Sequence, residues 1–103
     1  MSPERIFAAL GDPTRLKLVE LLSDGQSRSI QELTAGSPIS RQAMSKHLRV
    51  LEQARLVHSS RSGREVRFRL EQAELEHARA FLAKVAGQWE DALSRLANHA
   101  GEQ

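Results

Sequence analysis

Apolar residues recur at helical spacing near the start of the chain and predict a short first helix over about residues 3–10. Ser2 can cap this helix, Pro3 suits its first turn, and Gly11 can end it. Its apolar side consists of Ile6, Phe7 and Leu10.

The same signals predict two further helices before residue 36. Asp12-Pro13 opens one over about 13–23, and Ser29 can cap a shorter one at Ile30–Thr34. The longer helix is expected to bury Leu16, Val19 and Leu22, with Leu18 and Leu21 close by. The residues AGSP at 35–38 predict a turn before the next element.

The stretch SRQAMSKHLRVL at 40–51 predicts a helix with two unlike faces, capped by Ser40 and running to about Ala54. Met44, Leu48 and Leu51 have the spacing of a buried side. A solvated face usually mixes acids with bases, but no acid occurs in this stretch. The opposite side carries Arg41, Gln42, Ser45, Lys46 and Arg49.

The periodicity changes after residue 56, where LVHSS and VRFRL flank RSGRE. Val66, Phe68 and Leu70 alternate with Arg67 and Arg69, which is the period of a half-buried strand. Gly63 lies where a hairpin turn needs it. The pattern predicts a two-stranded hairpin with arginines at its tip and on its outer face.

Residues 72–98 predict a long final helix with an apolar seam at alternating steps of three and four residues. A helix packed on its own domain and a helix paired with a second copy of the chain both satisfy this seam. In a two-fold dimer the seam would be self-complementary, and Ile6 and Phe7 would add to it. The seam consists of Leu75, Ala78, Leu82, Val85, Trp89, Ala92 and Leu96.

Composition narrows the classes of function. The 103 residues suit a single domain over 1–103, without cysteine, a signal sequence or a membrane-length apolar run, so we expect a cytoplasmic protein with no membrane association. The net charge is only +2, but residues 41–69 hold eight bases and two acids. Such local concentration of positive charge is typical of a protein that binds a polyanion.

The predicted order α-α-α-α-β-β-α, mainly helical with a small β-hairpin, describes a winged helix-turn-helix. Its cationic helix fits the DNA major groove, and its hairpin can reach along the backbone. We expect Arg41, Gln42, Ser45 and Lys46 to read bases of double-stranded DNA. Residues expected at phosphates are Ser40, His47 and Arg49 on the helix and Arg61, Arg64 and Arg67 on the hairpin; a purely structural role for His47 stays open.

Other interpretations of the same residues stay open. Each cation taken alone could be a solvated surface residue. A winged helix can also bind a protein or RNA partner through its basic face. Nonspecific, architectural DNA binding is a third alternative, although such proteins usually carry a larger excess of bases than +2.

Three stretches, ALGDPTRLKLVELL, ISRQAMSKHLRVLEQARLV and RSGREVRFRL, together resemble the ArsR/SmtB family of bacterial winged-helix repressors over about residues 4–70. The QWEDALSRL stretch of the last helix is similar to members without a metal-binding signature. The resemblance implies a dimer through the first and last helices, with one recognition helix for each half of a near-palindromic operator. Binding would occlude a promoter on the nucleoid until an inducer releases it.

Many members of that family sense metals, but this chain lacks their patterns. SIQELT occupies the place of the family's Cys-x-Cys pair. His77 and His99 are 22 residues, or about 33 Å along a helix, apart and cannot share a metal within one chain. A site across a dimer with Glu74 or Glu76 stays open. We expect no metal and no cofactor.

Nothing in the chain has the pattern of a catalytic site, such as a glycine-rich phosphate loop or a nucleophile-elbow serine. The inducing signal also stays open. It could be a small apolar molecule near Trp89, a protein effector, or the concentration of the chain itself.

Overall fold

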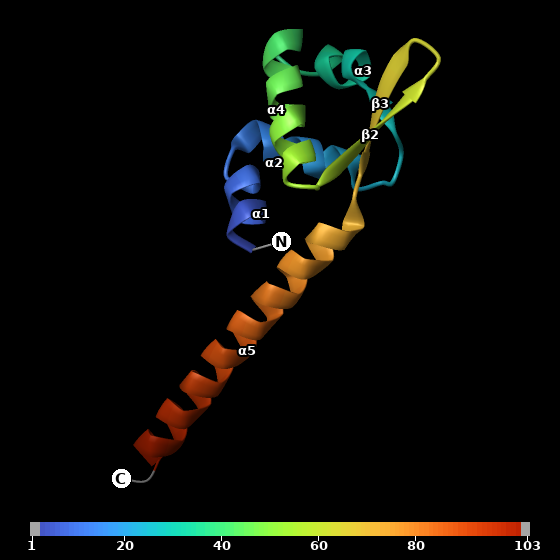
Figure 1. Cartoon of the computed structure of the whole chain (residues 1–103). Helices are drawn as coiled ribbons and strands as arrows, with labels where there is room; N and C mark the ends of the chain where they lie inside the picture. Colours follow the sequence, from blue (N-terminus) through green and yellow to red (C-terminus); the bar gives the residue numbers. More distant parts are fainter. Residues whose placement is uncertain (1–2, 102–103) are drawn as a thin grey trace.

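The computed structural model describes residues 3–101 and contains the predicted helices and hairpin (Figure 1). Ser2, the predicted cap of the first helix, lies outside the described residues. The elements are α1 (Pro3–Leu10), α2 (Pro13–Leu22), β1 (Arg28–Ser29), α3 (Ile30–Ala35), α4 (Arg41–Gln53), β2 (Val57–Ser62), β3 (Glu65–Leu70) and α5 (Gln72–Gly101).

Three of the helices begin at the caps that the sequence predicts. The Asp12 carboxylate accepts from the backbone N–H groups of Thr14 and Arg15 at the start of α2, at 2.9 and 3.1 Å. Ser29 and Glu32 form a reciprocal capping box at α3, and the Ser40 hydroxyl accepts from the Ala43 N–H at α4. These bonds fix the residues at which α2, α3 and α4 begin. They therefore also fix which residues form the first turn of α4.

The end of α4 is fixed by a Schellman motif. The Leu56 N–H donates to the Leu51 carbonyl, the Arg55 N–H donates to the Glu52 carbonyl, and both leucine side chains are fully buried. Arg55 occupies the left-handed region at φ 60°, where glycine is usually found. The chain reverses there and enters β2 directly after α4.

The hairpin is part of a three-stranded antiparallel sheet in the order β1-β3-β2, so the predicted two-stranded hairpin was incomplete. In the added strand β1, Arg28 pairs with Phe68 and Ser29 with Arg67. The hairpin turn forms as predicted, with Gly63 at φ 64°. The sheet therefore joins the hairpin to the N-terminal end of α3.

A single core joins α1, α2, α3, α4 and the base of the sheet. One prediction about it was wrong. Leu16 is half-exposed because α2 carries apolar residues around most of its circumference, and it is Leu18 and Leu22 that face inward. The buried residues are Ile6, Ala9, Leu18, Leu22, Leu33, Met44, Leu48, Leu51, Ala54, Leu56, Val57, Leu70 and Ala78.

Helix α5 leaves this core soon after it begins and extends away from it as a single rod (Figure 1). Its first turns pack on α1, where the rings of Phe7 and Phe81 lie 5.8 Å apart. The described chain consequently measures 70 × 26 × 22 Å. The alternative of a last helix packed along its own domain is therefore excluded for most of α5.

Candidate nucleic-acid interface

The cationic face of α4 is exposed along its length. We use this name for Arg41, Gln42, Ser45, Lys46 and Arg49, all five of which are exposed. The three cations among them form no ion pair with an acid among residues 3–101. The opposite side of the helix places Met44, Leu48 and Leu51 in the core. Burial of these three residues holds the cationic face outward.

The tip of the hairpin lies beside the beginning of α4, at the end of the molecule opposite to the C-terminus (Figure 1). A groove of about 440 Å³ runs between them, and Arg41, Ser45 and Arg64 all line it. Arg61 and Arg64 are exposed and unpaired within the described residues. The helix and the hairpin thus both place cations at this groove, which Glu65 also lines, as the helix-turn-helix and wing interpretation expects. We call Arg41, Lys46, Arg49, Arg61 and Arg64 together the positive surface.

Arg67, predicted on the outer face of the hairpin, is only partly exposed, because its guanidinium bonds to Ser27 in the loop before β1. The Arg67 guanidinium donates to the Ser27 carbonyl at 2.8 Å and to the Ser27 hydroxyl at 3.0 Å. It also pairs with Glu65 and with Glu32, at 2.5 and 3.1 Å. Arg67 therefore ties the sheet to α3 and neutralises two acids next to the positive surface, instead of adding a free cation.

His47 points partly inward from α4 toward the start of α2. Its Nδ1 atom lies 3.6 Å from the Asp12 carboxylate and 3.3 Å from the Arg15 guanidinium. The backbone N–H of Arg15, foremost, and the nearby His47 hold the pKa of Asp12 below its usual value. This geometry favours a structural role for His47, linking α4 to the α2 cap.

Most of the predicted dimer surface is exposed. Along α5 the exposed fractions are 53% for Leu82, 44% for Val85, 64% for Trp89 and 70% for Leu96. Leu75 and Phe7 are half-buried against the core. Ile6 is fully buried within its own protomer, so its side chain cannot reach a partner and the prediction that it lies in the interface was wrong.

The structure adds groups that the sequence pattern did not single out. Phe81 and Leu93 enlarge the exposed apolar surface of α5 beyond the heptad seam. Arg15, which bonds carbonyls at the end of α1 as well as contacting His47, connects α1, α2 and α4. The Asp-Pro-Thr-Arg order at the start of α2 was the available signal, because it places a cap and a long donor one turn apart.

Acidic and histidine side chains do not gather into a metal site within residues 3–101, in which no three of them come together. His77 and Glu74 form a pair, with the His77 Nδ1 atom 3.5 Å from the Glu74 carboxylate. In the same part of the chain no helix is long and apolar enough to cross a bilayer.

The fold and the exposed positive surface define a winged helix-turn-helix protein of the kind that binds DNA. A helix-turn-helix domain family matches residues 10–60. The HTH-type transcriptional regulator Rv2034 of Mycobacterium tuberculosis is 38% identical over 96 residues, covering 93% of this chain and 86% of that protein. The repressor SmtB of the same species is 36% identical over 88 residues, covering 85% of this chain and 63% of that protein.

Among solved structures, an ArsR-like transcriptional regulator from Rhodococcus sp. RHA1 superimposes with a TM-score of 0.78. It is 36% identical, and the match covers 91% of this chain and 88% of that one. The chain belongs to the ArsR/SmtB family of winged helix-turn-helix transcriptional regulators, which are not enzymes.

Proposed function

We propose that this chain is a homodimeric repressor that binds a near-palindromic operator in double-stranded DNA, in the bacterial cytoplasm and on the nucleoid. The observation that carries this proposal is the single groove lined by Arg41 and Ser45 of α4 and by Arg64 of the hairpin. An α-helix in the major groove brings the adjacent wing to the flanking backbone, so one rigid face serves both contacts.

The exposed residues of α4 fall into two groups, those expected to contact bases and those expected to contact phosphates. Arg41, Gln42, Ser45 and Lys46 lie in the first turns, where a recognition helix meets base edges. Arg and Lys donate to guanine, and Gln can form two hydrogen bonds with adenine. Arg49, Arg61 and Arg64 are assigned to phosphates, and Ser40 adds a phosphate contact while it caps the helix.

The exposed surface of α5 supports a dimer. This helix exposes four large apolar residues, Leu82, Val85, Trp89 and Leu96, and monomeric soluble proteins rarely leave a large apolar patch in water. A two-fold pairing of α5 with its copy, together with the Phe7–Phe81 contact to α1, would bury this surface symmetrically. The same two-fold axis would present one α4 to each half of the operator.

Repression follows from occupancy, because a dimer across a promoter excludes polymerase from it. SmtB, which this chain resembles, is named as a repressor. We further propose that the signal is not a metal: the chain has no cysteine, and within residues 3–101 His77 is paired only with Glu74. Titration calorimetry of the purified chain with Zn²⁺ tests this, and tight stoichiometric binding would overturn it.

Selection of bound fragments from random duplex DNA tests the proposed function. We expect enrichment of an inverted repeat, each half of which spans one major groove. The Arg41→Ala variant, selected in parallel, should lose preference at one or two positions in each half. Failure of the wild-type chain to enrich any sequence would exclude a sequence-specific repressor.

A further inference from the structure

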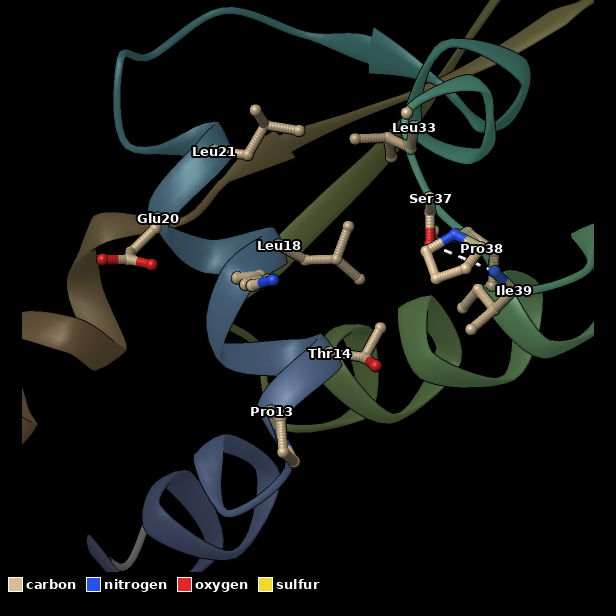
Figure 2. Close-up of a pocket in the computed structure, with 12 residues that line it drawn as sticks. Pro13, Thr14, Leu18, Glu20, Leu21, Leu33, Ser37, Pro38 and Ile39 are labelled. Carbon is tan, nitrogen blue, oxygen red and sulfur yellow. Dashed lines mark hydrogen bonds between the residues drawn. The ribbon is translucent and has the colours of Figure 1, made fainter.

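A cavity of about 530 Å³ lies between α2 and the turn that leads into α4 (Figure 2). Its volume lies within the range of about 300–1,000 Å³ that is usual for small-molecule sites. Leu18, Leu33 and Met44 form a buried apolar floor. In Figure 2, Leu18 and Leu33 point into the same space from opposite sides, and Pro38 and Ile39 lie on the side of Leu33.

One charged group is available to a ligand in this cavity. Lys17 lines it and forms no ion pair with an acid among the residues that the structure describes. Glu20 also borders the cavity, but its carboxylate points away from Leu18 and Pro38 (Figure 2). An apolar floor with a single cation at its rim fits a small molecule that has an apolar body and one carboxylate.

The position of the cavity connects it to DNA binding. One wall is α2, which belongs to the body of the domain, and the other is formed by residues 36–39 and Met44, which set the place of the first turns of α4. A molecule bound between these two walls either shifts the first turns of α4 relative to α2 or holds them in place. Its occupancy would therefore change how Arg41 and Ser45 meet the operator.

We infer that this cavity is the effector site, that it takes a small amphiphilic carboxylate, and that its occupancy weakens binding to the operator. The inference rests on the proposed repressor function. A ligand at one site typically changes the affinity of a second, coupled site by about 5- to 150-fold. We therefore expect the bound carboxylate to lower the affinity of the chain for its operator by at least about fivefold.

Binding is tested on the full chain without DNA, by amide NMR shifts and calorimetry. The probes are hexanoate, 3-phenylpropanoate and indole-3-acetate, each compared with its corresponding alcohol. We expect shifts at Leu18, Leu33 and Ile39 with at least one carboxylate, and weaker binding of its alcohol. Thr14→Phe, which fills the cavity from its rim, should abolish the shifts, and Lys17→Gln should lower carboxylate affinity by about fivefold.

Lys84→Gln on α5 is the matched control and should leave binding unchanged, because Lys84 lies outside the cavity. Absence of shifts at the cavity with all three carboxylates would overturn the inference, as would equal binding of acid and alcohol. Operator affinity measured with and without the bound carboxylate completes the test. An unchanged affinity in a chain that still selects its operator would refute the effector role while leaving the repressor function intact.

Discussion

Arg64→Ala removes one cation from the tip of the wing in each protomer, and its effect on salt dependence can be worked out from the structure. On α4 and at the hairpin tip, each protomer presents five exposed cations that form no ion pair within residues 3–101, namely Arg41, Lys46, Arg49, Arg61 and Arg64. Three of them, Arg49, Arg61 and Arg64, are assigned to phosphates. With these three cations at phosphates in both protomers of a dimer, the slope of log K against log salt concentration would be about −5.4. Loss of two Arg64 contacts should reduce its magnitude by about 1.8.

The assay is fluorescence anisotropy of a labelled duplex over a range of salt concentrations, with the selected operator and with an unrelated duplex. Arg64→Ala should weaken binding to both duplexes by the same factor, because a phosphate contact carries no sequence information. Lys84→Ala, a cation on α5 outside the positive surface, is the control and should leave the slope unchanged. An unchanged slope for Arg64→Ala, or loss of discrimination between the duplexes, would refute the assignment of the wing.

Four further predictions concern specificity, assembly and stability. Arg41→Ala should remove about 1–3 kcal/mol of discrimination at the base pair that Arg41 contacts and little at other positions, measured as binding free energies on operators with single substitutions; an equal loss of affinity for all of these operators would make Arg41 a phosphate contact. Trp89→Glu should shift the chain toward monomer in sedimentation experiments, because it places a charge on the exposed apolar surface of α5; an unchanged dimer would move the interface elsewhere. Arg55→Gly should raise the free energy of unfolding by about 1 kcal/mol, because φ of 60° strains any residue with a side chain; a decrease in urea melts would contradict this. The Arg28 guanidinium lowers the pKa of Asp24 from 3.8 to about 2. The ionised Asp24 carboxylate therefore makes its full contribution to the stability of the fold above pH 3.8, and this contribution is lost as the pH falls toward 2. Asp24→Asn should therefore be less stable than wild type at neutral pH and approach it near pH 2, and a pH-independent difference would argue against the pair.

Local signals in the sequence predicted the parts of the fold that depend on neighbouring residues. The caps at Asp12, Ser29 and Ser40 are side-chain-to-backbone bonds across two or three residues, so their sequence pattern is nearly sufficient. The cationic face of α4 followed from a periodicity of 3.6 residues with unlike sides. The hairpin turn followed from Gly63.

Features that depend on distant contacts were missed or wrongly assigned. Strand β1 is two residues long, too short for any periodicity, and it exists because β3 pairs with it. That pairing brings Ser27 next to Arg67, which strand alternation alone placed outward, and the two form hydrogen bonds. Helix α1 is so short that Ile6 and Phe7 could not be separated into a core and a surface residue before the position of α5 was known.

The positive surface and the exposed apolar surface of α5, which we propose as the dimer surface, lie at opposite ends of the chain, so the account requires two chains for one symmetric site. Sedimentation equilibrium with the selected duplex, and with a duplex that keeps only one half-site, tests this requirement most directly. We expect two chains on the full site and a large loss of affinity on the half-site. A single chain bound with equal affinity to both duplexes would contradict the account.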